Sequence, residues 1–331
     1  MFKPIYLLPQ FSIERQNQYQ QRWESDIGKK EHDIIIEEIK QGAGEDFLQS
    51  DFEKGILSVL ENCNDLRGMK FWQLAIDFSH GENFKWSDFS FIEAWHCKFS
   101  AATFYSTNCN FGKFYNCEFN SCLLGFSHWY GVTFEKVKFS TCDFVEFDTF
   151  INCKFCECEF IGCFFSQNPF ADCYFDVRTV FQKEVKQKPN SDFKTGFKNQ
   201  QLPALYKGIK DAYLTGEVFD QYRRYFFKQK HTETRYLKKG LVKIIGYFIE
   251  YISGYGVKPF KSILFSILII CIFALIYKFS GVANAVKTSI GAFVGVCNDI
   301  TSWMQLLESA IGIALFALFI TILANVWFTE K

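Results

Sequence analysis

The sequence predicts a mixed β/α membrane protein in which a solenoid of five-residue repeats precedes a C-terminal pair of membrane-spanning helices. Three observations support this fold class. A large apolar residue recurs every five positions through the middle of the 331-residue chain. Two apolar runs near the C-terminus are long enough to cross a bilayer. The segments that flank the repeat have apolar residues in helical patterns.

The composition limits the function classes. Phe accounts for 41 residues, against 3 Met and 6 Pro, which indicates a repeated structural slot for one aromatic side chain. The formal net charge of zero and the pI of 6.9 give no overall attraction to nucleic acid, so we expect no nucleic-acid partner. The 13 cysteines are an odd number, and the N-terminal residues lack a secretory signal. We therefore expect reduced thiols in the cytosol rather than disulfides.

Two residue slots define the repeat. The central slot holds Phe in 15 of 19 units, and the small slot, two residues earlier, holds eight of the 13 cysteines. A helical period of 3.6 or a strand period of 2 cannot place both sets together, whereas a five-residue solenoid face can. In chain order the central slot contains Phe84, Phe89, Ala94, Phe99, Phe104, Cys109, Phe114, Phe119, Leu124, Trp129, Phe134, Phe139, Phe144, Phe150, Phe155, Phe160, Phe165, Phe170 and Phe175.

This pattern resembles the pentapeptide-repeat family, whose unit is small–polar–Phe/Leu–x–x. The resemblance implies a right-handed quadrilateral β-helix over residues 63–177, with four units per coil, nearly five coils and a height of roughly 23 Å. One extra residue between 145 and 150 shifts the frame and predicts a corner bulge. Upstream, Leu66, Phe71 and Ile76 would be degenerate opening units. Both slots would point inward, and the expected core ladders include Phe99, Phe119, Phe139, Cys117, Cys122, Cys142, Cys153 and Cys158.

Two other interpretations of the repeat are weaker. A metal site in the cysteine ladder would need ligands at closer spacing and would displace Phe rings, so we expect packing and no metal. DNA mimicry, a role of some soluble members of the family, needs a strongly acidic face. Residues 82–175 hold 11 Asp/Glu and 6 Lys/Arg, which is only mildly acidic.

Helical segments flank the solenoid. Residues 1–62 predict a helical cap with an apolar cluster at Ile34–Ile36 and Ile39. Residues 178–257 predict a linker with helices at 202–213 and 218–236, the second strongly basic. Within that linker, Leu241, Ile244, Ile245, Phe248 and Ile252 form an apolar stripe. Such a helix suits the membrane interface, and an ordinary packing helix is the alternative.

The last segment, 258–331, predicts a transmembrane hairpin with spans at about 259–280 and 310–328 and a re-entrant loop at 283–302. Buried helices of a soluble protein are the alternative. Ten Lys or Arg residues lie before or at the start of the first span, within 223–261, whereas the connector side holds only Lys278 and Lys287. The bulk of the chain and both termini should therefore face the cytoplasm, at a cytoplasmic (inner) membrane.

The run Ile252–Pro259 and the second span resemble bacterial proteins that join pentapeptide repeats to a two-helix, ion-channel-like domain. The resemblance implies a pore helix and filter between the spans, in a homo-oligomer of four chains. The family filter reads Thr-Val-Gly-Tyr-Gly-Asp, and here Val296 and Cys297 replace its Tyr and second Gly, so potassium selectivity is not expected. The candidate pore and filter residues are Val294, Gly295, Val296, Cys297, Asn298, Asp299 and Glu308. Asp299 and Glu308 would favour monovalent cations near an outer mouth, or would be solvated end charges.

Two function hypotheses follow. The first is a pore gated by a cytoplasmic solenoid that binds a protein or ligand, for example a membrane-depolarising effector in bacterial defence. The second is a membrane-anchored scaffold for protein interactions without conduction. Catalysis is not expected, because the five histidines are scattered and no phosphate loop or nucleophile motif occurs; the sequence predicts no catalytic residue and no cofactor.

Overall fold

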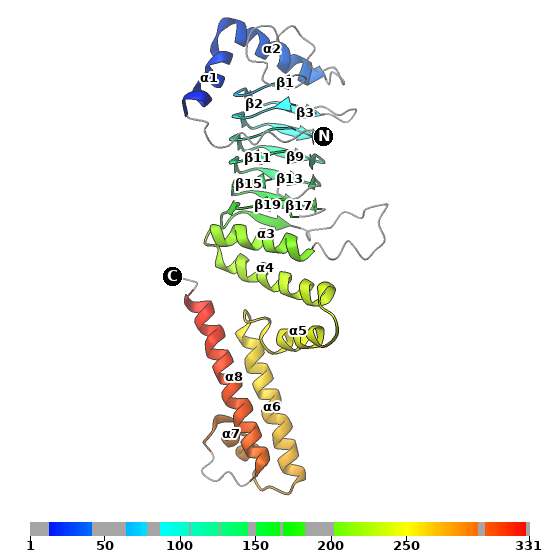
Figure 1. The fold of residues 1–331 in the computed structure, drawn as a ribbon, viewed down its shortest axis with the longest axis vertical. Helices are drawn as coiled ribbons and strands as arrows, with labels where there is room; N and C mark the ends of the chain where they lie inside the picture. Colours follow the sequence, from blue (N-terminus) through cyan, green and yellow to red (C-terminus); the bar gives the residue numbers. More distant parts are fainter. Residues whose placement is uncertain are drawn as a thin grey trace. The chain divides into compact units, whose positions relative to one another are not determined.

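A computed structural model of the protein describes residues 13–41, 64–77, 87–105, 107–125, 127–144, 150–165, 168–182, 202–296 and 302–328. The chain forms two compact units, residues 1–222 and 223–331 (Figure 1). The first unit contains the solenoid and the second contains the apolar helices of the C-terminal part.

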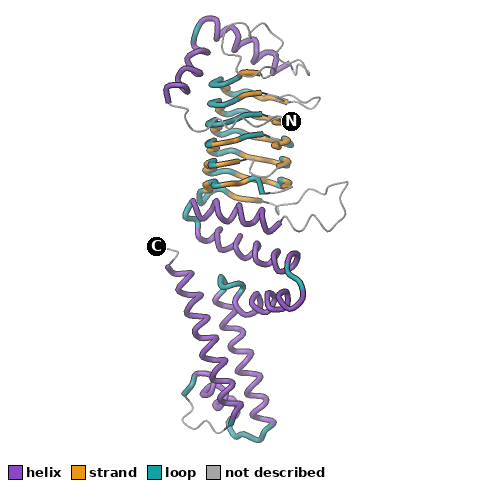
Figure 2. Tube along the Cα trace, viewed as in Figure 1, coloured by secondary structure: helices purple, strands orange, loops and turns teal. Residues whose placement is uncertain are grey.

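The solenoid is a stack of short parallel strands with four faces, visible as orange layers in Figure 2. The first face contains β2 (Lys70–Trp72), β5 (Glu93–Trp95), β8 (Lys113–Tyr115), β12 (Thr133–Glu135), β16 (Lys154–Cys156) and β20 (Tyr174–Phe175). The second contains β3 (Ala75–Asp77), β6 (Lys98–Ser100), β9 (Glu118–Asn120), β13 (Lys138–Ser140), β17 (Glu159–Ile161) and β21 (Val180–Gln182). The third contains β7 (Thr103–Tyr105), β10 (Leu123–Gly125), β14 (Asp143–Phe144) and β18 (Phe164–Phe165).

The fourth face is the least regular. It contains β1 (Asn64–Asp65), β4 (Ser87–Asp88), β11 (Trp129–Tyr130), β15 (Phe150–Ile151) and β19 (Phe170–Ala171). Single bridges through Asn108 join β4 to the row of β11. The parallel β-solenoid that the repeat predicts is therefore confirmed by strand pairing.

The strand register follows the five-residue frame. Phe114 lies beside Phe134 in the next coil, and Phe134 lies beside Phe155. The predicted bulge at 145–150 falls largely outside the described residues, but the pairing of Trp129 with Phe150 shows that the coil absorbs one extra residue.

The central slot forms the aromatic core. Phe99, Phe119 and Phe139 are buried, and the ring centroids of successive members are 4.8 and 5.1 Å apart with nearly parallel planes. The stack continues from Phe139 to Phe160 at 4.9 Å. A regular large ring at one position therefore fills the axis of the solenoid without alternation between large and small residues.

The small-slot thiols have a specific partner. Cys142 Sγ donates to the carbonyl of Phe119 at 3.2 Å, and Cys122 Sγ donates to that of Phe99 at 3.3 Å. The same bond to a central-slot carbonyl of the preceding coil is made by Cys117, Cys153, Cys158, Cys163 and Cys173. The ladder thiols thus bridge consecutive coils as weak donors.

The corners of the solenoid turn through residues with left-handed backbone conformation. One corner is formed by His96, Asn116, Lys136 and Glu157, whose φ angles lie between 52° and 56°. Only a few of these corner positions hold Gly, so the repeated turn imposes a conformation that most L-residues adopt at some energetic cost.

Helices cover both ends of the solenoid (Figure 1). At the first end are α1 (Ile13–Glu24) and α2 (Asp26–Gln41), and Trp23 Nε1 donates to the carbonyl of Arg67 at 2.9 Å. At the other end is α3 (Leu202–Thr215), where the Tyr213 hydroxyl donates to the carbonyl of Thr179 at 2.6 Å. These caps cover strand edges that would otherwise template further pairing.

The solenoid extends beyond the predicted end at residue 177. Strand β21 continues the second face, and Phe181 stacks on Phe160 with ring centroids 4.6 Å apart. The prediction stopped at Phe175 because the spacing to Phe181 is one residue longer than the repeat. The insertion resembles the earlier frame shift, which the solenoid also accommodates.

The remaining helices lead into and form the second unit. Helix α4 (Phe219–Thr232) crosses the boundary between the units and continues as a π-helical turn at Glu233–Leu237. Then come α5 (Gly240–Ser253), α6 (Pro259–Phe279), α7 (Ala285–Val294) and α8 (Trp303–Phe328). The linker helices expected at 202–213 and 218–236 correspond to α3 and to α4 with its π-helical turn.

Candidate functional site in the membrane-proximal helices

Two helices of the second unit are long and apolar enough to cross a membrane. They are Pro259–Phe279, which is α6, and Trp303–Ala324, which is most of α8; their mean hydropathies are 2.5 and 2.4. The sequence places the first span at 259–280 but begins the second at 310, whereas α8 begins at Trp303. Glu308 therefore lies within α8, and its carboxyl group has hydrogen-bond partners on two other helices.

The short helix α7 packs against both α6 and α8 near the connector end of the pair (Figure 1). Gly312 of α8 lies against the backbone of Phe293, so close that a Cβ atom there would collide with the Phe293 carbonyl oxygen. Ala292 and Ser289 are also buried. Helix α7 lies inside the predicted re-entrant loop at 283–302, and it packs more closely than a surface connector would.

A polar group joins these three helices. The Tyr277 hydroxyl of α6 donates to Glu308 Oε2 at 2.8 Å, and the Ser289 hydroxyl of α7 contacts Glu308 Oε1. Ser289 Oγ also lies 2.9 Å from the carbonyl oxygen of Ile270. Tyr277, Ser289 and Glu308, the inter-helix cluster, are all at most 2% exposed. Both carboxyl oxygens of Glu308 are occupied within one chain, and its effect on cations at a pore mouth stays a prediction.

The filter candidates are described only in part. Val294 ends α7, and Gly295 follows with φ of +75°, a left-handed conformation in which glycine is favoured. Val294 and Val296 are exposed in the single chain, at 63% and 68%. Cys297, Asn298 and Asp299 lie outside the described residues. The structure therefore identifies Gly295 as the residue where the chain leaves α7.

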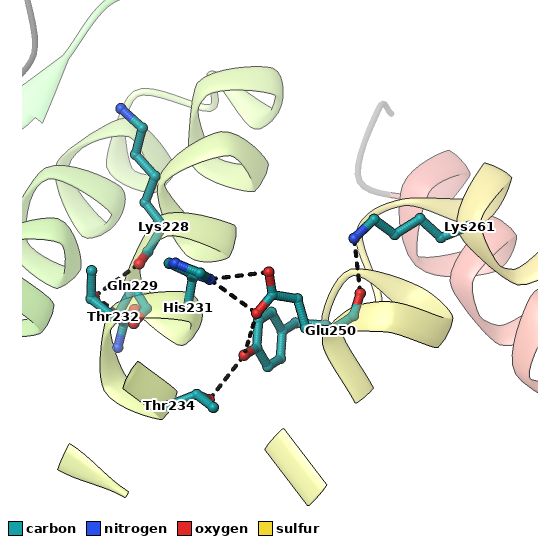
Figure 3. Close-up of polar contacts among 8 residues, drawn as sticks. Lys228, Gln229, His231, Thr232, Thr234, Glu250 and Lys261 are labelled. Atoms are coloured by element: carbon teal, nitrogen blue, oxygen red, sulfur yellow. Dashed lines mark hydrogen bonds and ion pairs between the residues drawn. The ribbon is translucent and has the colours of Figure 1, made fainter. Parts of the chain in front are cut away.

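A second polar cluster joins α4, α5 and the start of α6 (Figure 3). His231 Nδ1 lies 2.9 Å from Glu250 Oε2, and the Tyr255 hydroxyl donates to Thr234 Oγ1 at 2.9 Å. Lys261 Nζ donates to the backbone carbonyl of Glu250 at 3.0 Å. We call His231, Thr234, Glu250, Tyr255 and Lys261 the juxtamembrane cluster.

The electrostatics of the juxtamembrane cluster favour a fixed geometry. Burial raises the pKa of Tyr255 to about 12, and the nearby Glu250 carboxylate contributes to this shift. The phenol therefore stays a hydrogen-bond donor at neutral pH. Lys258 Nζ adds a cation–π contact 4.0 Å from the ring centroid of Phe227. The start of α6 is thus connected to α4 through cation–π contacts with Phe227, and to Glu250 of α5, which in turn contacts His231 of α4.

Sequence reasoning missed this cluster. His231 is one of five histidines scattered along the sequence, and Glu250 lies off the apolar stripe of the helix predicted after residue 240. They meet because the chain passes from the π-helical turn at Glu233–Leu237 through the extended residues Lys238 and Lys239 into α5, and such an irregular connection has no periodic signature. The run Ile252–Pro259 was the available signal, since Gly254 and Gly256 adopt positive φ there.

The outer surface of the solenoid carries a separate feature. A groove of about 580 Å³ lies along one corner and is lined by two rows of polar side chains from successive coils. The rows contain His96, Asn116, Lys136 and Glu157, and Lys98, Glu118, Lys138 and Glu159. Nearby, Trp72, Trp95 and Tyr115 form an outward aromatic row with centroid separations of 5.9 and 5.8 Å. Among the described residues, no group of three or more His, Cys, Asp or Glu side chains is placed to hold a metal ion.

No family model and no curated protein matches the chain. Among solved structures, full-length QnrB1, a plasmid-mediated fluoroquinolone resistance protein, is 12% identical with a TM-score of 0.19, covering 38% of this chain and 91% of that one. A trypsin-treated variant of QnrB1 is 10% identical with a TM-score of 0.14, covering 38% and 84%.

The chain is a β-solenoid protein with two candidate membrane helices. This statement rests on its own strand pairing and on the length and composition of α6 and α8, because similarity at these TM-scores supports no argument.

Proposed function

We propose that the protein is a non-catalytic subunit of an oligomeric membrane pore whose solenoid binds a cytoplasmic protein or ligand. In this proposal α6 and α8 span a cytoplasmic membrane twice, with both termini in the cytoplasm, and four chains surround a path for monovalent cations. The juxtamembrane cluster would transmit a change at the solenoid side to the first turn of α6.

The observation that carries this proposal is the packing of α7 against both α6 and α8. A simple anchor needs only two spanning helices and a turn. Here an additional apolar helix is held by the Gly312–Phe293 contact and by the inter-helix cluster, and it ends at a left-handed Gly295. Non-helical backbone at membrane depth is tolerated where it is buried in protein or lines water, so this arrangement supports a pore-lining segment after α7.

Planar-bilayer recordings of the purified full-length protein test the proposal. We expect a cation current in the wild type and its loss in Gly295→Val, because a β-branched residue is strained at positive φ and would displace the segment. Gly281→Val is the matched control, because Gly281 also has a positive φ of +77° and lies in the turn after α6. A Cβ atom added at Gly281 would have no other atom within 4 Å. An unchanged current in Gly295→Val would refute the filter assignment.

A membrane-anchored scaffold is the second candidate, and the rows on the solenoid favour it. The polar groove and the aromatic row present side chains at coil spacing, as a surface for an extended partner would require. Absence of current in every bilayer experiment would support this function. A fall in partner capture on Trp95→Ala, with capture unchanged on Val177→Ala at an exposed position elsewhere, would then identify the binding row.

A further inference from the structure

Helix α5 presents apolar side chains to solvent around most of its circumference. Leu241 is 71% exposed, Ile244 66% and Phe248 57%. The helix has few polar residues, so most of the surface that it exposes is apolar. Its buried residues are Gly246, Ile252 and Ser253, and Gly246 packs against Thr234 of the π-helical turn. A helix with so much exposed apolar surface needs a covering that the second unit itself does not supply.

The position of α5 restricts what that covering is. Only residues 254–258 separate it from α6, and this turn is closed by hydrogen bonds. Lys258 N donates to the carbonyl of Ser253 at 3.2 Å, and Ser262 Oγ donates to that of Ile252 at 3.1 Å. The end of α5 is therefore held at the first turn of α6. If α6 spans a bilayer, α5 lies at the surface of that bilayer.

The charge around α5 specifies the lipid. Residues 223–261 contain ten Lys or Arg and two acidic residues, Glu233 and Glu250. Both acids have internal partners: Glu233 pairs with Lys230 at 2.9 Å, and Glu250 pairs with His231. The basic residues beside the apolar face, Lys238, Lys239 and Lys243, lie immediately before α5 or in its first turns, and Lys239 is exposed. A second copy of such a segment would bring like charges together, which opposes that occupant.

We propose that α5, with Lys238, Lys239 and Lys243, is a binding surface for the anionic phospholipids of the cytoplasmic leaflet. The apolar side chains enter the boundary between headgroups and acyl chains, while the lysines contact lipid phosphates. This inference rests on the proposed function, because it requires α6 to span the membrane.

Hydrogen–deuterium exchange of the full-length protein in nanodiscs tests the inference. Discs of phosphatidylcholine alone are compared with discs of phosphatidylcholine and phosphatidylglycerol at 3:1. We expect α5 amides to exchange more slowly in the anionic discs. Each lysine near an anionic surface contributes roughly fivefold to affinity for that surface. The double variant Lys238→Gln with Lys239→Gln should therefore lower the extra protection of α5 in anionic discs, by up to roughly 25-fold. The matched control is Lys278→Gln with Lys287→Gln, which removes two exposed lysines outside α5 and should leave α5 exchange unchanged.

The same measurement separates the two ways of failing. If α6 and α8 amides exchange rapidly in every disc, membrane spanning is refuted and the proposed function fails with it. If α6 and α8 are protected but α5 exchange is the same in both discs, the lipid inference alone is overturned. Protection of α5 that follows the number of chains per disc rather than lipid charge would also overturn it, because the covering would then be a second copy.

Discussion

At the scale of single residues, the solenoid depends on a repeated pair made by a central Phe and a cysteine of a following coil. The Phe ring fills the axis, and its carbonyl accepts a thiol hydrogen bond, as in the contact of Cys142 with Phe119. A thiol suits this position because it is small and apolar and is still a weak donor. The abundance of buried cysteine therefore has a packing explanation that needs no metal.

Replacement of Phe119 by Ala should lower the free energy of unfolding by about 3–5 kcal/mol, because it leaves a cavity between Phe99 and Phe139. Chemical denaturation of the purified protein measures the change. The neighbouring Glu118→Ala, on the solvent side of β9, should change it by less than about 0.5 kcal/mol. Similar values for the two variants would contradict the inward ladder.

The buried thiols predict a loss of stability at high pH. Burial raises the pKa of Cys109 and Cys153 above the ordinary value of 9.0. The unfolded chain thus loses these protons near pH 9 while the folded chain keeps them. Stability is fully present below pH 9 and falls as pH rises above it, by about 1.4 kcal/mol per pH unit for each thiol.

Urea denaturation at pH 7, 9 and 10 under reducing conditions measures this dependence. Cys153→Ala should flatten the slope above pH 9 by the contribution of one thiol. Val177→Ala, at an exposed position that carries no ionisable group, should leave the slope unchanged. Equal slopes for wild type and Cys153→Ala would show that this thiol ionises in the folded chain as it does in the unfolded one.

At the scale of secondary-structure elements, helices cover the two ends of the solenoid, and a short helix packs against the two long apolar helices. Helix α3 covers the last coil through Tyr213, and α1 and α2 cover the first through Trp23. In the second unit, α7 packs against both α6 and α8 and covers part of their surface. Each of these contacts depends on one close approach that a larger or more polar side chain would disturb.

Gly312→Val tests the α7–α8 contact. The added side chain would collide with the Phe293 carbonyl, so we expect a loss of about 1–3 kcal/mol in the packing of the helical unit. Thermal unfolding in detergent measures this loss as a lower midpoint. Ala314→Val, on an exposed part of the same helix, should keep the wild-type midpoint. Equal midpoints for both variants would refute the close approach.

At the scale of the whole molecule, the division into two units frames the functional proposals. Residues 1–222 contain the solenoid and its caps, and residues 223–331 contain the candidate membrane helices. Helix α4 belongs to both units, and its end carries His231 of the juxtamembrane cluster. Because α4 connects the two units along the chain, the proposed function is tested on the full chain.

The sequence by itself determined the features that repeat or persist along the chain. The five-residue period specified the parallel solenoid and its Phe core, because every unit obeys the same local rule and errors in single units average out. Length and hydropathy likewise identified α6 and most of α8. The end of the solenoid was misplaced because Phe181 follows a one-residue insertion, although its ring still stacks on Phe160.

Only the tertiary structure decided the contacts between residues far apart in the chain. It paired Glu308 with Tyr277 and Ser289, and it joined His231 to Glu250 across a π-helical turn. It also assigned the ladder thiols their carbonyl partners. These contacts depend on the three-dimensional path of the backbone, and a single occurrence of each leaves no period in the sequence for a pattern to detect.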